Sequence, residues 1–138
     1  MQNIHVTLAF LGDLDPAQRS AVEAGCPAMA TSYALTLDRI GYWKQGGIVW
    51  AGARIPDPEF MDFAELIRDS LRRAGLGIET RPFIPHLTLL RRARRLPRVR
   101  VEAIEWRIKE YTLVASELTP EGSHYSILRR WSSRGDVK

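Results

Sequence analysis

Two histidines and two threonines of this chain occur in the same four-residue pattern, His-x-Thr-Leu. The pattern appears at residues 5–8 as HVTL and again at residues 86–89 as HLTL. The chain has three histidines in all, so two of them belong to this pattern. Residues i and i+2 of a strand point to the same face. Each copy, if extended, therefore presents an imidazole and a hydroxyl group side by side.

The chemistry of these four side chains suits proton transfer around a phosphate. An imidazole is partly protonated near neutral pH, so His5 and His86 can act as an acid and a base on two sides of one phosphorus atom. The hydroxyls of Thr7 and Thr88 can donate to the non-bridging oxygens, and a nearby arginine would stabilise the charge that builds there. We therefore expect a metal-independent site, since the sequence has no His-Glu-x-x-His motif and no cysteine cluster. From the residues alone, a two-histidine metal site or two histidines that merely pack are alternatives.

The stretches around both patterns resemble the bacterial and archaeal RNA 2′,3′-cyclic phosphodiesterases, historically called 2′-5′ RNA ligases, of the two-histidine (2H) phosphoesterase superfamily with its HXTX motifs. The resemblance is carried by residues 3–12 (NIHVTLAFLG), 48–52 (IVWAG), 85–91 (PHLTLLR) and 113–125 (LVASELTPEGSHY). It implies that His5 is the proton donor, that His86 is the proton acceptor, and that Thr7, Thr88 and Arg91 hold the phosphate. The two motif strings are nearly identical, so the residues themselves do not assign the acid and the base.

The resemblance also implies a reaction and a set of partners. An RNA 2′,3′-cyclic phosphate end, or a cyclic nucleotide, would be hydrolysed to a 2′-phosphate without a cofactor, with reversible 2′-5′ ligation as a side activity. One alternative is another 2H activity, such as a 2′-5′ oligonucleotide phosphodiesterase. The other is an RNA-binding module of the same fold without turnover. Family members usually carry a strand and a helix before the first motif, but here Met1 lies only four residues before His5, so we expect these elements to be missing. We expect a monomer, or a dimer if the missing strand leaves a sheet edge uncovered.

Arginines and aromatic residues supply further candidates for RNA contacts. Of the 20 basic residues 17 are arginine, and six of these lie between residues 91 and 100, a run that indicates either an RNA backbone track or a solvated loop. Four aromatic side chains are candidates for stacking on a base, although packing in the core is the alternative for each. These candidates are Trp43, Phe10, Phe83 and Tyr125. We expect Trp50, within a β-type run, to be a core residue.

Composition and patterning predict a single α+β domain over residues 1–138. We expect a 2H-phosphoesterase-like fold of two pseudo-symmetric lobes of antiparallel sheet, with helices outside and a central cleft. The lone Cys26 suits a reducing, cytoplasmic setting, and no apolar run is long enough to predict a membrane span. Apolar periodicity and turn residues predict the elements. They are strands at 3–11, 33–40, 48–54, through His86, 105–117 and 124–131, a connection at 41–47, and helices that begin near Asp15 and Asp57 and end by Pro27 and Gly75.

Overall fold

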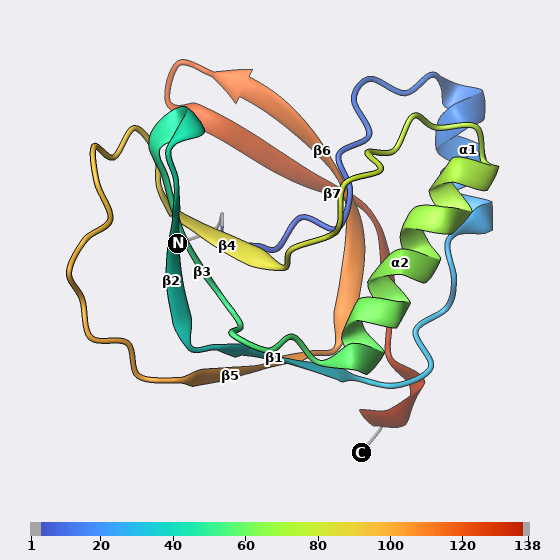
Figure 1. Ribbon diagram of the computed structural model, residues 1–138. Helices are drawn as coiled ribbons and strands as arrows, with labels where there is room; N and C mark the ends of the chain where they lie inside the picture. Colours follow the sequence, from blue (N-terminus) through green and yellow to red (C-terminus); the bar gives the residue numbers. More distant parts are fainter. Residues whose placement is uncertain (1–3, 137–138) are drawn as a thin grey trace.

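The computed structural model describes residues 4–136, which form two α-helices and seven strands (Figure 1). The predicted α+β class is confirmed. The helices are α1 (Pro16–Gly25) and α2 (Pro58–Arg73), and the strands are β1 (Tyr33–Leu37), β2 (Arg39–Trp43), β3 (Ile48–Gly52), β4 (His86–Leu90), β5 (Ile104–Ile108), β6 (Glu110–Thr119) and β7 (Gly122–Ser132), with short 3₁₀ turns η1 (Gln45–Gly47) and η2 (Arg134–Asp136).

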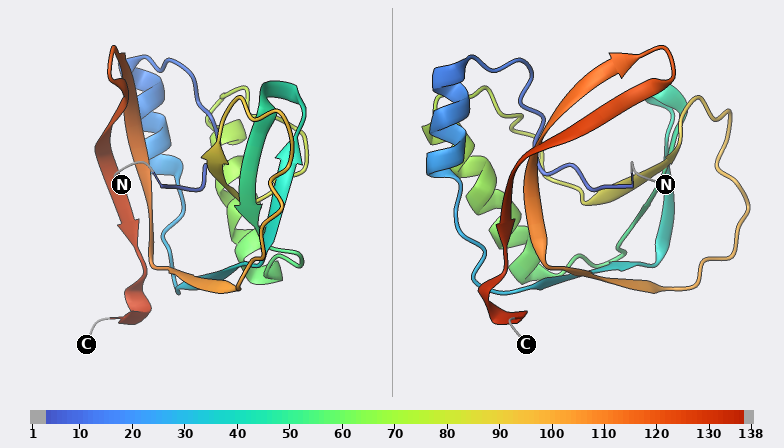
Figure 2. Two further views of the ribbon diagram at one scale, coloured as in Figure 1. Left: turned by 90° about the vertical axis from the view of Figure 1, so that its left-hand side faces the viewer. Right: turned by 180° about the vertical axis from the view of Figure 1, so that it is seen from behind.

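The seven strands form three small antiparallel sheets. β1 pairs with β5, β2, β3 and β4 form a sheet in that order, and β6 pairs with β7. The β6–β7 hairpin and the β2–β3–β4 sheet lie on opposite sides of the N-terminal segment, residues 4–11 (Figure 2). This arrangement puts the first motif between two sheets, one of which carries the second motif on β4.

Both helices begin at an aspartate followed by proline. The Asp15 carboxylate accepts a hydrogen bond from the backbone N–H of Gln18 (2.8 Å), and the Gln18 side chain accepts one from the backbone N–H of Asp15 (2.9 Å). This capping box satisfies two N–H groups that the helix leaves without partners. Asp57 caps α2 through one such bond, which its carboxylate accepts from the backbone N–H of Phe60. The predicted starts are confirmed, and α1 ends at Gly25, before Pro27.

The main core lies between the two helices and the β6–β7 hairpin. Apolar residues from α1, α2 and β6 meet there, and Figure 1 shows both helices together on one side of the molecule. The buried members are Val22, Met29, Phe63, Ile67, Leu71, Leu76, Ile78 and Leu113. Phe63, Ile67 and Leu71 of α2 face this core, because a spacing of four residues puts side chains on one side of a helix.

The predicted strand over residues 3–11 is wrong for the residues described, while Asn3 lies outside them. Residues 4–11 make one isolated bridge, Val6 to Leu87 on β4, and no longer ladder. Beyond the bridge, Leu8 and Leu11 pack against the main core. The apolar run that suggested a buried strand is therefore used for packing under the helices.

Two predicted strands are each divided in the structure. The run 33–40 breaks at Asp38, whose carboxylate accepts a hydrogen bond from the backbone N–H of Arg54 (2.7 Å). The run 105–117 breaks at Lys109. On either side of each break the chain changes partner, so the two halves belong to different sheets. The connection expected at 41–47 is also shorter, because residues 41–43 belong to β2.

Candidate functional site

The two His-x-Thr-Leu segments lie side by side, joined by the antiparallel bridge between Val6 and Leu87. In an antiparallel pair the residues next to a bridge face each other, so His5 lies opposite Thr88, and Thr7 lies opposite His86. Val6 is half-buried and Leu87 is buried, which makes theirs the inner face. The two imidazoles and two hydroxyls therefore share the outer face, where opposite Cβ atoms are about 5 Å apart.

His86 is held in a defined orientation. Its Nδ1 lies 2.7 Å from the carbonyl oxygen of Ile84. A carbonyl oxygen can only accept, so Nδ1 carries the hydrogen, and in the neutral ring Nε2 holds the free lone pair. The ring of Trp43 meets the imidazole edge-on, with 4.6 Å between centroids. This geometry suits a base that takes a proton at Nε2.

Trp50 forms a platform beside His86, on the same face of the sheet. The pairing register places Trp50 opposite Thr88 on β4 and opposite Gly41 on β2. A Cβ atom at Gly41 would lie 2.1 Å from Cζ2 of Trp50, so the indole lies directly on the glycine backbone. Trp43 packs on this indole with 5.1 Å between centroids. Trp50 is 5% exposed, which confirms its predicted place in the core.

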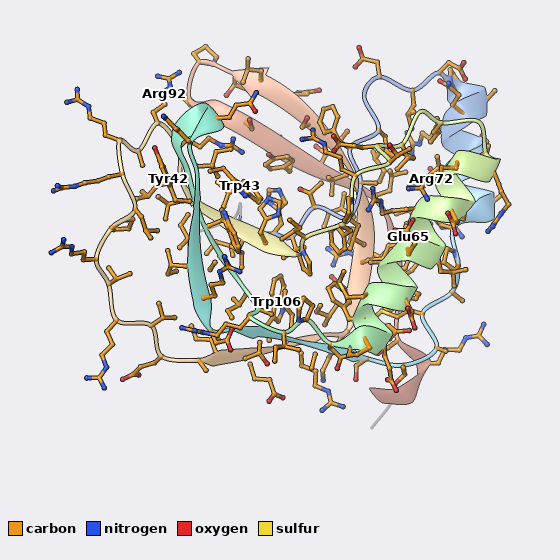
Figure 3. All side chains as sticks on the ribbon, in the orientation of Figure 1. Tyr42, Trp43, Glu65, Arg72, Arg92 and Trp106 are labelled. Carbon is orange, nitrogen blue, oxygen red and sulfur yellow. The ribbon has the colours of Figure 1, made fainter. Side chains whose placement is uncertain are left out.

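Two residues missed by the sequence analysis, Gly41 and Arg39, belong to the same face. Gly41 makes room for the indole, and the guanidinium of Arg39 lies 5.4 Å from the centre of the Trp50 ring. The alternating order Arg39, Gly41, Trp43 along β2 was the available signal, because residues i, i+2 and i+4 of a strand share a face. Figure 3 shows Trp43 on the side of β2 that faces the middle of the molecule, with Tyr42 on the opposite side.

His5 has different surroundings from His86. Its ring lies 5.3 Å from that of Tyr125 on β7, in an edge-to-face arrangement. His5 and Thr7 are both exposed, whereas His86 and Thr88 are half-buried. The β6–β7 hairpin thus supplies one flank of the site and the β2–β3–β4 sheet supplies the other. Of the four aromatic residues singled out in the sequence, Trp43 and Tyr125 lie against the two motif histidines.

The remaining candidates are Phe83, Phe10 and Arg91, and they have other surroundings. Phe83 packs against Phe60 of α2 (6.3 Å) and lies 5.9 Å below the guanidinium of Arg68. Phe10 is 83% exposed. Arg91 follows the last residue of β4 and is exposed. The structure brings neither phenylalanine into ring contact with a histidine of the motifs.

Within residues 4–136, no three side chains of histidine, cysteine, aspartate or glutamate come together in a group that could hold a metal ion. In the same part of the chain no helix is both long and apolar enough to cross a membrane. Cys26 and Tyr111, whose pKa values burial raises, belong to the core under the helices.

Comparison with known protein families agrees with this geometry. Residues 2–120 match the model of the 2′-5′ RNA ligase superfamily. The chain belongs to this superfamily. Two proteins that are similar to this chain in sequence are named RNA 2′,3′-cyclic phosphodiesterase. The protein from Escherichia coli (strain K12) is 33% identical, and the alignment covers 94% of this chain and 76% of that protein. The protein from Thermus thermophilus is 31% identical, and the alignment covers 96% of this chain and 73% of that protein.

Solved structures of similar proteins have the same fold as this chain. The crystal structure of E. coli LigT complexed with 3′-AMP has a TM-score of 0.82 and 32% identity, and covers 96% of this chain and 78% of that one. The crystal structure of TT0787 of T. thermophilus has a TM-score of 0.73 and 29% identity, and covers 97% of this chain and 80% of that one. The predicted 2H-phosphoesterase-like fold is therefore confirmed.

Proposed function

We propose that this chain hydrolyses RNA 2′,3′-cyclic phosphate ends to 2′-phosphates, with His5 and His86 as the catalytic pair. The observation that carries the proposal is the Val6–Leu87 bridge, because it places both histidines and both threonines on one face. The names of the relatives supply the substrate class. A packing role for the histidines would not require two hydroxyls to accompany them on that face.

The proposed mechanism uses the two histidines in different protonation states. Neutral His86 accepts a proton at Nε2 from a water molecule, whose oxygen forms a bond to phosphorus. The bond from phosphorus to O3′ breaks, and protonated His5 gives its proton to O3′. The 2′-phosphate remains as the product. If a 5′-hydroxyl group attacks in place of water, the same steps form a 2′-5′ bond, which accounts for reversible ligation.

The surroundings of the two rings support this division of roles. The hydrogen bond to the Ile84 carbonyl leaves Nε2 of His86 as the proton acceptor. His5 lies against the tyrosine ring of Tyr125, whose π-electrons attract a cation and so suit a protonated imidazole. A general acid or base contributes about 10²–10⁴-fold to a rate. We expect this range for the loss of either imidazole.

Thr7, Thr88 and Arg91 would bind the phosphate oxygens. A β-bulge between β3 and β4 supports the assignment of Arg91. Val49 pairs with Leu90 and Trp50 pairs with Thr88, so β4 has one extra residue between these two pairs. A bulge of this kind shifts the alternation of side chains by one. Continued past Leu90, the shifted alternation places Arg91 on the face of His86 and Thr88.

One assay tests the proposal. The protein is given a 2′,3′-cyclic nucleotide and a short RNA with a cyclic end, in the presence of EDTA, and the product is identified. We expect a 2′-phosphate, a bell-shaped pH dependence of kcat/KM, and a loss of about 10²–10⁴-fold in His5→Ala and in His86→Ala. His124→Ala, which removes the third histidine, on β7, is the matched control and should keep full activity.

Several outcomes would contradict the proposal. Activity that survives in both histidine variants would exclude the site, and activity abolished by EDTA would exclude the metal-independent mechanism. A 3′-phosphate product would reverse the assignment of the leaving oxygen. RNA binding without turnover on any cyclic substrate would instead support the RNA-binding module.

A further inference from the structure

The positive charge of this chain is concentrated in residues 91–100, which we call the arginine loop. The loop holds six of the 20 basic residues and none of the 16 acidic ones. The other residues comprise 14 basic and 16 acidic ones, although the whole chain has a net charge of +4. The excess positive charge of the protein therefore resides in this one segment, which immediately follows the strand that carries His86 and Thr88.

In residues 4–136, six of the eleven arginines outside the arginine loop make ion pairs with carboxylates. They are Arg19, Arg68, Arg72, Arg81, Arg129 and Arg130. No arginine of the loop is in an ion pair with a described residue, and all six are exposed. Like charges so close together repel one another. A loop that keeps them unpaired is well suited to a polyanion.

The start of the arginine loop is fastened to the turn that follows Trp43. The backbone N–H groups of Arg92 and Ala93 donate to the carbonyl oxygens of Gly46 (3.1 Å) and Gly47 (2.8 Å). The hydroxyl of Tyr42 also donates to the Ala93 carbonyl (3.1 Å). Trp43, the last residue of β2 before this turn, contacts His86, so a continuous path leads from the catalytic face to the loop.

The backbone at this anchor has little freedom. Arg92 has φ of 58°, a conformation that non-glycine residues rarely adopt. A Cβ atom on Gly47 would lie 2.4 Å from the Ala93 carbonyl oxygen, so the turn and the loop are in close contact. From there the chain bows outward along the edge of the molecule before it enters β5 (Figure 1), and nitrogen-tipped side chains project from it, away from the sheets (Figure 3).

The second half of the arginine loop combines cations with apolar surface. An open hollow of about 520 Å³ is lined by one cation, one carboxylate and five apolar residues, which are Arg100, Glu102, Ile40, Val99, Val101, Ala103 and Ile104. Val99 is 57% exposed and Ile104 is 62% exposed. Proteins that bind single-stranded nucleic acid combine a positively charged groove, which follows the phosphates, with aromatic side chains on which bases stack. In this hollow aliphatic side chains take that place, so a base would make apolar contact with them.

We infer that the arginine loop and this hollow form a second binding surface for the body of a single-stranded RNA whose cyclic end lies at the histidines. The inference rests on the proposed function for the position of the RNA end, and it adds that the substrate is a polynucleotide rather than a nucleotide. Phosphates upstream of the cyclic end contact the arginines, and the neighbouring apolar surface receives a base.

Counterion release sets the size of the expected effect. For single strands, the logarithm of the binding constant falls with the logarithm of salt concentration with a slope of about −0.7 per phosphate contact. Four contacts give a slope of about −2.8, which is roughly a 50-fold loss of affinity between 50 and 200 mM salt. Arg94, Arg95, Arg98 and Arg100 are the four that lie outside both the catalytic face and the strained turn.

The test compares two variants with the same change in net charge. One is R94Q/R95Q/R98Q/R100Q in the loop, and the control is R19Q/R73Q/R130Q/R134Q, at exposed positions elsewhere. KM and kcat are measured for 2′,3′-cyclic CMP and for an RNA of about 12 nucleotides with a cyclic end. We expect the loop variant to raise KM for the RNA at least tenfold at low salt and to flatten its salt dependence. Both constants for cyclic CMP should stay unchanged, as should those of the control variant.

A binding arm keeps this inference separate from the proposed function. A labelled RNA of the same length with a 3′-hydroxyl end is titrated with the wild-type chain and with each variant, by fluorescence anisotropy, which requires no turnover. If no substrate is turned over but binding depends on the loop, the inference stands and the proposed function fails. Equal RNA binding by the wild-type chain and the loop variant would overturn the inference. Equal weakening in both variants would also overturn it, because that result reflects net charge alone.

Discussion

Gly41→Ala tests whether the indole platform positions His86. The added Cβ would lie 2.1 Å from Cζ2, 2.2 Å from Cε2 and 2.7 Å from Cη2 of Trp50. Carbon atoms in contact are normally about 3.5–4.0 Å apart, so the indole must move by more than 1 Å or the strands must separate. Trp43 covers the indole, which leaves little space for such a movement.

Overpacking of this kind costs about 1–3 kcal/mol. For 138 residues the entropy of unfolding is about 0.3 kcal/mol per kelvin, so Tm should fall by about 3–10 °C. Because Trp43 and Trp50 both contact the His86 ring, the imidazole should shift with them. A misplacement of 1 Å in a catalytic group can cost about 10²-fold. We therefore expect kcat to fall together with Tm.

Calorimetry and the cyclic phosphate assay measure the two effects. Gly25→Ala is the matched control, because no atom lies within 4 Å of the added Cβ there, and Tm should stay the same or rise slightly. In the double variant G41A/W50L the smaller side chain removes the overlap, so the losses of stability should be less than additive. Wild-type stability and activity in Gly41→Ala would refute the platform, and additive losses would refute the contact.

Three further predictions concern elements that support the site. Asp15→Ala should lower the free energy of unfolding in urea by about 0.5–2 kcal/mol, whereas Asp15→Asn should keep the cap; equal losses would contradict the capping box. Arg68 is buried and donates to the carbonyls of Glu79 and Arg81, between α2 and β4. Arg68→Ala should therefore cost about 1.5–3 kcal/mol in urea unfolding and lower the cyclic phosphodiesterase activity, while exposed Arg73→Ala should change neither. Burial raises the pKa of the Tyr111 hydroxyl, so the stability that its neutral form provides below pH 10 is lost above it; a pH series of urea titrations should show a shallower alkaline loss in Tyr111→Phe, and parallel curves would contradict this.

The paired motifs could be predicted from the sequence because their geometry is local. Alternation along an extended chain puts a histidine and the threonine two residues later on one face, whatever the partner segment. The helix starts at Asp15 and Asp57 were equally accessible, since a cap is decided within four residues. For these elements the sequence separations are short enough for the pattern itself to determine the structure.

Strand limits depended on partners far away in the sequence. Residues 33–43 read as a strand followed by a connection, and the division at Asp38 arises because the first part pairs with β5 and the second with β3. Residues 4–11 are apolar enough for a buried strand, yet Leu8, Ala9 and Leu11 pack against the main core instead of joining a ladder. Periodicity reports which side chains are buried, but it does not report which backbone will be the neighbour.

The platform under the catalytic face could not be predicted for a related reason. It requires Gly41 to lie opposite Trp50, and that match is fixed only by the register of the β2–β3 hairpin. A slip of one residue would turn the indole to the other face. The three-residue η1 turn sets this register, so the turn and the glycine act together on the position of His86.

The Val6–Leu87 bridge also has a consequence for folding. It joins segments that are 81 residues apart in the sequence, while the two hairpins close over turns of a few residues. Contacts between distant segments form late, because the chain between them must first be ordered. We therefore expect enzymatic activity to return after the hairpins have formed during refolding, so that the recovery of turnover would report the last step in assembly of the native chain.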